Sequence, residues 1–243
     1  MASIWYHQRK RTRKARVVMY TAVSGGYDAI FPHIFLVEDW DYVCFTDQPD
    51  MVKGVWECRK LEHRFGIDHN RNAKYYKMFP QKLFPEYDYS IWIDANCDVL
   101  GEDLSIAAYA AMDERMALSA PLHEHRKCVY KEITKLIALK KDSYAKIKEW
   151  ESILESSHYP HDNGLYALGI IFRRHNDPTV AALMEEWWQI IQRYSKRDQI
   201  SFVYLLRKYG IACPPLLGDK GIGNHPGLLL RGHRSCSKSL PDV

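Results

Sequence analysis

One stretch of the sequence, residues 87–100, constrains the fold more than any other. It reads YDYSIWIDANCDVL, and its first half, YSIWI at residues 89–93, is aromatic and β-branched. This composition is typical of a strand that is buried on both faces of a parallel sheet. Parallel sheets need helices over both faces, so the stretch predicts an α/β domain.

Three oxygen-bearing side chains follow this predicted strand. Asp94, Asn96 and Asp98 occupy alternate positions, so an extended backbone would send all three to one face at the carboxyl end of the strand. Open α/β sheets bind their ligands at that edge, and oxygen ligands there suit Mg²⁺ or Mn²⁺ carrying a phosphate. The alternative is a strand-ending turn, because Asp and Asn side chains also bond their own backbone two residues on.

Composition and charge limit the classes of protein to consider. The 243 residues, 47% of them hydrophobic, allow one large α/β domain or two small ones. There is no apolar run of about eighteen residues and no signal-peptide core, so neither a membrane span nor a secretory signal is expected, and the chain is interpreted as cytoplasmic. The net charge of +4 is mild and no nucleic-acid-binding motif occurs, so nucleic acid is not an expected partner.

The two ends of the chain differ from its body. Residues 7–16 hold six Lys or Arg residues and no acidic residue. This basic arm is either a solvated, mobile segment or a contact to the anionic face of a membrane that carries a lipid-linked substrate. The sequence therefore divides into a basic arm (1–15), a main α/β domain (16–228) and a flexible tail (229–243).

Strand and helix patterns alternate along the body. Strands are predicted near residues 15–23, 42–46, 55–59, 89–93, 116–121, 168–172 and 211–217, and helices in 68–79, 106–112, 127–156 (two), 178–194 and 200–209.

A basic stripe lies on the helix before the central strand. Arg71, Lys74 and Lys77 are three residues apart, so they are predicted to lie along one side of that helix. A diphosphate needs a metal on one side and ammonium or guanidinium groups on the other, which a basic helix beside the carboxylate edge would supply. The alternative is a solvated helix face.

Four isolated polar residues are further candidates. Asp47 ends the second strand and either accepts hydrogen bonds from a base or ribose or caps a turn, and Asp198 at a helix start is in a capping position. Asp162 in the loop HDNG could line a substrate pocket. His225, on a glycine-rich loop, is either a late metal ligand or an exposed residue.

The order of these blocks is more specific than any one of them. GGYD, YVCFTD, a basic R-x-x-K-x-x-K helix before LFPEYDYSIWIDAN, GLYALGIIFRRHNDP, a paired-tryptophan helix and RDQISF follow one another. This order resembles the TOD1/MUCI70 family of glycosyltransferase-like proteins over about residues 17–209. The resemblance implies a single, Rossmann-like GT-A domain with a central, mostly parallel sheet flanked by helices, in which a strand-end D-x-D motif holds Mn²⁺ or Mg²⁺ on the donor diphosphate.

Carried over residue by residue, the resemblance gives Asp94 the first position of that motif and Asn96 the third. Asn is neutral and binds metal more weakly than Asp, so Asp98 contributes, the metal is held loosely, or activity is independent of metal. Asp47 matches the nucleoside-contacting position and Asp198 an acidic position near the acceptor. His225 is placed only by analogy with a late histidine ligand.

The function implied is transfer of a sugar from a nucleotide-sugar donor, with a UDP-sugar expected, to a glycan or lipid-linked acceptor in polysaccharide biosynthesis. If the reaction inverts, a carboxylate must take the acceptor proton, with Asp198 as first choice and Asp162 as second. Two alternatives stay open. One is a metal-assisted hydrolase of a phosphorylated or lipid substrate, and the other is a non-catalytic module that binds a nucleotide sugar.

Overall fold

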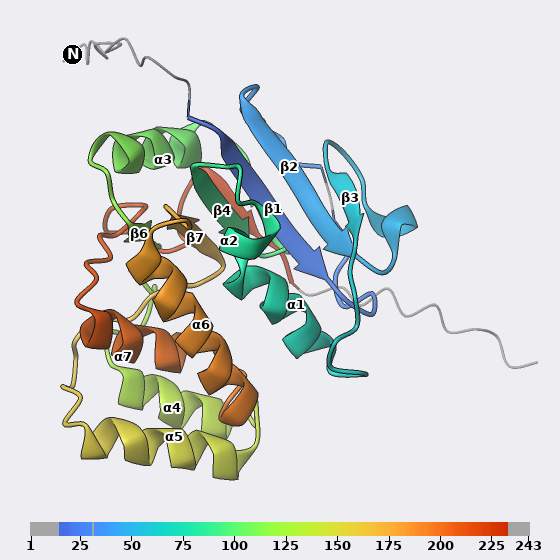
Figure 1. Cartoon of the computed structure of the whole chain (residues 1–243). Coiled ribbons are helices and arrows are strands. Elements are labelled where there is room, and N and C mark those ends of the chain that lie inside the picture. The colour runs from blue at the N-terminus through green and yellow to red at the C-terminus, as the bar shows by residue number, and fades with distance from the viewer. Residues whose placement is uncertain (1–14, 31, 233–243) are drawn as a thin grey trace, which may run out of the picture.

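The computed structural model describes residues 15–30 and 32–232, and the centre of the fold is a six-stranded sheet (Figure 1). Its strands, in spatial order, are β3 (Glu57–Lys60), β2 (Trp40–Thr46), β1 (Val17–Val23), β4 (Tyr89–Ile93), β7 (Ile170–Arg173) and β6 (Leu118–Ser119). The first four are mutually parallel, whereas β7 runs antiparallel to both β4 and β6. The expected α/β domain with a mostly parallel sheet is therefore confirmed.

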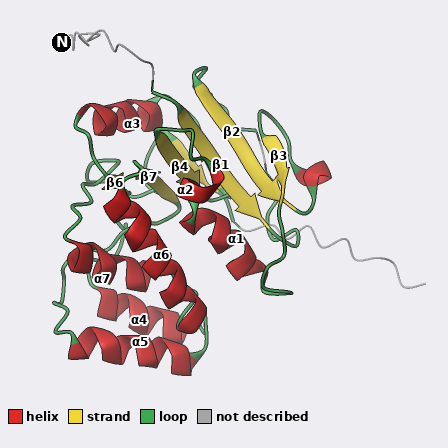
Figure 2. Cartoon of the chain, viewed as in Figure 1, coloured by secondary structure: helices red, strands yellow, loops and turns green. Residues whose placement is uncertain are grey.

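Seven α-helices and a short 3-10 helix occur in the described residues. They are η1 (Pro49–Met51), α1 (His69–Met78), α2 (Pro80–Leu83), α3 (Asp103–Asp113), α4 (Val129–Ala138), α5 (Tyr144–Ser156), α6 (Pro178–Arg193) and α7 (Gln199–Tyr209). In Figure 2 helices α4 to α7 form a stack beside the sheet, while α1 and α2 lie in front of it.

Both faces of the sheet are buried, as the uninterrupted apolar strands require. In β1, Val18 and Tyr20 point into a core shared with α1 and α4 to α7. Val17 and Met19 point the other way, into a core shared with α3 and with the segment that precedes β8 (Leu228–Leu230). The alternation follows from the two-residue period of a strand.

The order of the strands positions the ligand-binding edge. β1 lies between β2 and β4, so the chain moves outward from β1 first in one direction and then in the other. In open α/β sheets a crevice forms at such a switch point, outside the carboxyl ends of the strands. Tyr20 pairs with Trp92, so β1 and β4 bring the residues that follow them to the same edge.

One predicted strand and the start of the predicted tail were wrong. Residues 211–217 form no strand apart from an isolated bridge between Ala120 and Pro215, because Pro214 and Pro215 have no N–H to donate to a ladder. The structure instead pairs β8 antiparallel with β5 (Cys97–Val99). Residues 229 and 230, expected in a flexible tail, therefore belong to a strand.

The basic arm up to residue 14, and residues 233–243 of the predicted tail, lie outside the described residues. Within the described part, no helix combines the length and apolar character that crossing a lipid bilayer demands.

Candidate functional site

A pocket of about 240 Å³ opens at the carboxyl ends of β1 and β4, at the switch point of the sheet. Its walls come from five segments: the loop after β1, the inner face of α1, the turn after β4, the two residues before β7 and the start of α7. The polar residues that line it are Ser24, Tyr27, Asp28, His69, Asn70, Lys74, Lys77, Asp94, Asn96, Arg197, Asp198 and Gln199.

Asp94 is held at the mouth of this pocket. Its backbone N–H donates to the carbonyl of Gly169 at 2.7 Å, which continues the β4–β7 pairing by one residue. The Trp92 indole Nε1 donates to its Oδ1 at 2.7 Å. The side chain nevertheless remains 44% exposed, so the carboxylate is oriented by the protein and open to a ligand.

The backbone turns directly after Asp94. The N–H of Cys97 donates to the Asp94 carbonyl at 2.9 Å, so the chain does not stay extended. Asn96 still lines the pocket, and its Nδ2 donates to the carbonyl of Arg231 at 2.9 Å. Asp98 is buried and paired with the Arg231 guanidinium, because it belongs to β5. The predicted common face for Asp94, Asn96 and Asp98 is therefore corrected: Asp98 does not share the pocket with the other two.

Two lysines of α1 meet one carboxylate inside the pocket. The Nζ atoms of Lys74 and Lys77 both lie 2.7 Å from Oδ2 of Asp198. Lys77 also donates to the Leu168 carbonyl at 2.8 Å and lies 3.8 Å from Oδ1 of Asp94. Asp198 precedes α7 but makes no capping hydrogen bond with its side chain, because that side chain is turned toward the lysines.

This cluster changes the acid–base properties of its members. Burial, with the positive charges of Lys77 and Arg197, lowers the pKa of Lys74 to about 8, although Asp198 opposes the change. Burial alone would raise the pKa of Asp198, but the two ammonium groups outweigh it and hold that pKa well below its ordinary value. A carboxylate with so low a pKa is a weak general base.

Arg71 lies elsewhere. Its guanidinium pairs with Asp68 at 2.5 Å and donates to the backbone carbonyls of Ile191 and Tyr194 at the end of α6. Residues three apart on an α-helix differ by about 60° around the helix axis. Arg71 and Lys77, which are two such steps apart, therefore point about 120° away from each other. The predicted single stripe is therefore divided: Lys74 and Lys77 line the pocket, and Arg71 ties α1 to α6.

Arg197 is a pocket residue that the sequence reasoning missed. It lines the pocket beside Asp198. Its Nε is buried and has no hydrogen-bond partner among the described residues, since Asp198 is occupied by the lysines. The sequence signal for Arg197 is its position in the RDQ block, directly before Asp198. A guanidinium that the surrounding protein leaves partly unsatisfied is suited to an anionic ligand.

Arg173 was also missed, and it supports the site from behind. It is fully buried at the end of β7, and its guanidinium donates to the Lys77 carbonyl at 2.6 Å and to the Tyr20 hydroxyl at 2.5 Å. Lys77 is in the last turn of α1, where the helix dipole favours a positive charge. Arg173 therefore fixes the end of the helix that carries both lysines.

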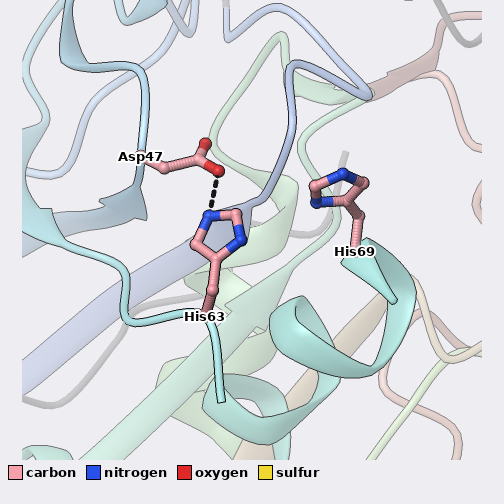
Figure 3. Close-up of side chains that lie close together, drawn as sticks. All are labelled: Asp47, His63 and His69. Atoms are coloured by element: carbon pink, nitrogen blue, oxygen red, sulfur yellow. Dashed lines mark hydrogen bonds and ion pairs between the residues drawn. The ribbon is translucent and has the colours of Figure 1, made fainter. Parts of the chain in front are cut away.

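Asp47 is placed next to the pocket but does not line it. Its carboxylate accepts from the Gly25 N–H, at 3.1 Å to Oδ1 and 2.9 Å to Oδ2, and it contacts Nε2 of His63. His69 lies across from His63 and Asp47 (Figure 3). Its Nδ1 is 2.9 Å from the Ser24 hydroxyl. The ligand atoms of Asp47, His63 and His69 lie within 4.8 Å of one another.

The remaining two candidates do not line the pocket either. Asp162 lies on an exposed loop, where its carboxylate is 3.3 Å from Nζ of Lys131. Nδ1 of His225 accepts from the N–H of Gly227 at 3.1 Å, within its own loop. The structure thus brings Asp94, Asn96, Lys74, Lys77 and Asp198 together and leaves Arg71, Asp47, Asp162 and His225 outside that group.

A family model matches the part of the chain that holds most of the sequence blocks described above. The family model described as "TOD1/MUCI70, glycosyltransferase-like domain" matches residues 43–214, which run from within β2 to beyond α7 and include the pocket residues of α1, of the turn after β4 and of the start of α7. The chain belongs to the TOD1/MUCI70 glycosyltransferase-like family. The resemblance inferred from the order of blocks is confirmed. No curated protein matches the chain.

Among solved structures, the chain is similar to the apo structure of a WbbM bifunctional glycosyltransferase. The two share 13% sequence identity with a TM-score of 0.42. The match covers 85% of this chain, which spans 39% of the length of that structure.

Proposed function

We propose that this TOD1/MUCI70 domain transfers a sugar from a nucleoside-diphosphate donor, a UDP-sugar in the first instance, to a hydroxyl of a glycan or lipid-linked acceptor. The observation that carries the proposal is one pocket at the β1–β4 switch point, where Lys74, Lys77 and Arg197 face Asp94 and Asn96. Family membership supports sugar transfer as the reaction class. The pocket chemistry supports an anionic ligand.

The charges of the pocket match the needs of such a reaction. When the sugar leaves, negative charge develops on the oxygens of the departing diphosphate, and fixed cations nearby stabilise it. Lys77 is held by Leu168 and Asp198, so it is already in place before the ligand binds. Among the cations that line the pocket, Arg197 has an Nε without a hydrogen-bond partner in the described residues, and we assign it to the diphosphate oxygens.

The residues at the turn after β4 fit a divalent cation of the Mg²⁺ or Mn²⁺ type. Asp94 keeps its carboxylate open to the pocket, and Asn96 uses its amide nitrogen on Arg231, which leaves its carbonyl oxygen for another partner. Such a cation would neutralise the donor phosphates. Two protein ligands are few, so the donor itself and water would supply the rest.

We assign Asp198 a positioning role. Its carboxylate holds the ammonium groups of Lys74 and Lys77 side by side, which they could not tolerate without it. Its lowered pKa makes proton abstraction from an acceptor unfavourable. The assignments of Asp198 or Asp162 as general base remain predictions of the sequence.

The deciding experiment has two steps. A thermal-shift panel of UDP-, GDP-, CMP- and dTDP-sugars, each with and without Mn²⁺, identifies the donor, because a ligand that binds only the folded state raises its stability. Product analysis with that donor, in water alone and with a set of glycan acceptors, then separates the classes. Acceptor-dependent release of the nucleotide is the expected result. If the nucleotide is released in water alone as fast as with an acceptor, the result supports a hydrolase instead. If the donor stabilises the protein but no nucleotide is released, the result supports a binding module.

A further inference from the structure

We propose that Asp47, His63 and His69 form a binding site for a transition-metal ion of the Zn²⁺ class, separate from the cation proposed at Asp94. The three residues belong to three segments: the end of β2, the loop after β3 and the first residue of α1. Their ligand atoms lie within 4.8 Å of one another (Figure 3). This inference goes beyond sugar transfer and does not depend on it.

The donor set determines the class of metal. Two imidazoles and one carboxylate suit Zn²⁺ and related ions, whereas Mg²⁺ and Ca²⁺ prefer oxygen ligands. Two ligand atoms on one tetrahedral Zn²⁺ ion, each about 2.0–2.1 Å from the metal, lie about 3.3 Å apart. A rearrangement of these side chains by about 1.5 Å, which also separates His63 from Asp47, would therefore bring all three onto one ion.

Two of the three ligand side chains, those of Asp47 and His69, are already oriented by a contact outside the cluster. The Gly25 N–H donates to the carboxylate of Asp47. Nδ1 of His69 lies 2.9 Å from the Ser24 hydroxyl, and this contact fixes the direction of the ring. Partners of this kind set the tautomer and direction of ligand side chains in metal sites.

Gly25 shows how closely this site is built. It has a φ of 66°, and a Cβ atom at this position would lie 2.5 Å from Cε1 of His69. Only glycine lets the loop after β1 pass over the imidazole while its N–H reaches Asp47. The same glycine thus holds two of the three ligands.

The site is accessible from solvent. Asp47 and His63 line a second, shallower pocket between the ends of β2 and β3, and the side chain of His63 is 36% exposed. A metal ion can therefore enter without opening the fold. His69 and Ser24 also line the pocket at the carboxyl ends of β1 and β4, so a bound ion would stiffen one wall of that pocket.

The test uses the full chain without a histidine tag, freed of metal by chelator. Co²⁺ is titrated and followed by its visible absorption bands, and Zn²⁺ affinity is measured by competition with a chromogenic chelator. We expect saturable, stoichiometric binding that is weakened about tenfold or more in His63→Gln, His69→Gln and Asp47→Asn. His125→Gln is the matched control, because that exposed histidine lies in the H-x-H segment away from the site.

Two results would overturn the proposal: absence of saturable Co²⁺ binding by the wild-type chain, or equal affinity in the wild type and all three ligand variants. Circular dichroism of each metal-free variant establishes folding. His63→Gln decides the outcome if another variant unfolds, because His63 lies on a partly exposed loop. The readout needs no nucleotide sugar, so failure of the donor proposal leaves this test intact.

Discussion

Arg197 and Arg71 give opposite expectations although both are arginines close to α1. Arg197 lines the pocket with Nε unsatisfied in the described part of the chain, whereas Arg71 is bonded to Asp68 and to two carbonyls of α6. The first arginine is available to a ligand, and the second is committed to the fold. Their substitution separates binding from stability.

We expect Arg197→Ala to weaken UDP binding by about tenfold or more, because a hydrogen bond to a charged group contributes about 1.5–3 kcal/mol. Its thermal unfolding in the absence of ligand should change little. Arg71→Ala should do the reverse, with a lower Tm and little loss of UDP affinity. Calorimetric titration and thermal melts of both variants check this, and equal loss of affinity in the two would contradict it.

Asp94 and Asn96 give a second residue-scale prediction. Asp94→Ala should abolish the Mn²⁺-dependent part of the stabilisation by UDP, because it removes the charged metal ligand, while Asn96→Asp should preserve or strengthen it. Thermal shifts with and without Mn²⁺ measure both effects. Asp219→Ala, at an exposed aspartate, is the control. Unchanged shifts in Asp94→Ala would remove the metal from this position.

Lys74 gives a pH dependence. Its pKa is lowered to about 8, so the ammonium is protonated below that pH and loses its charge above it. The diphosphate is already ionised at neutral pH. UDP affinity should therefore fall as the pH rises from about 7 to about 9, and Lys74→Arg should flatten the profile because arginine stays charged. Titration calorimetry across this range measures it, and an equal slope in both proteins would exclude Lys74 as the source.

At the scale of elements, the cluster at Asp198 joins helix α1 to the start of α7. Lys74 and Lys77 come from one helix and Asp198 from the other, and all three side chains are largely buried. Removing one partner of a buried ion pair leaves charge without compensation, which costs more than the pair contributes. The contact therefore stabilises the fold and arranges the pocket at once.

We expect Asp198→Asn to lower the free energy of unfolding by about 3 kcal/mol at neutral pH. In the folded wild type the pKa of Asp198 is lower than its ordinary value of 3.8. The contribution of Asp198 to the free energy of unfolding is therefore complete above pH 3.8 and is lost as the pH falls below that value. The difference between wild type and variant should accordingly shrink in acid. Urea unfolding at several pH values tests this, and a constant difference would place the effect on another group. A Lys74→Met change in the variant should recover part of the loss.

The whole molecule uses the sheet as a platform on which distant segments meet. The pocket walls come from the loop after β1, from α1, from the turn after β4, from the two residues before β7 and from the start of α7, whereas α4 and α5 pack on the far part of the helical stack. A ligand should therefore order the first group and leave the second unchanged.

Hydrogen exchange gives the corresponding prediction. Saturating UDP with Mn²⁺ should slow exchange in residues 24–28, 69–77, 94–97 and 197–199, and leave α4 and α5 unaffected beyond the general gain in stability. At a concentration of about one hundred times Kd that gain is about 2.7 kcal/mol. Protection concentrated in α4 and α5 would place the ligand at another site.

The sequence alone determined the sheet strands, most helices and the family. Buried strands and amphipathic helices leave local periodic patterns, and the stretch around Asp94 identified the correct edge of the sheet. The sequence also supplied five members of the pocket. Asp94, Asn96, Lys74 and Lys77 follow from a strand end and a helix face, which can be read from spacing, and Asp198 follows from the family resemblance.

Only the tertiary structure decided which charges meet. Lys77 and Asp198 are 121 positions apart, and nothing local indicates that one carboxylate takes both lysines while Nε of Arg197 has no partner in the described residues. The same holds for β8, whose partner β5 lies far back in the chain, and for Asp47 beside His63 and His69. Contacts between distant segments are set by the packing of whole elements, and one turn of the backbone after Asp94 was enough to send Asp98 into a different environment.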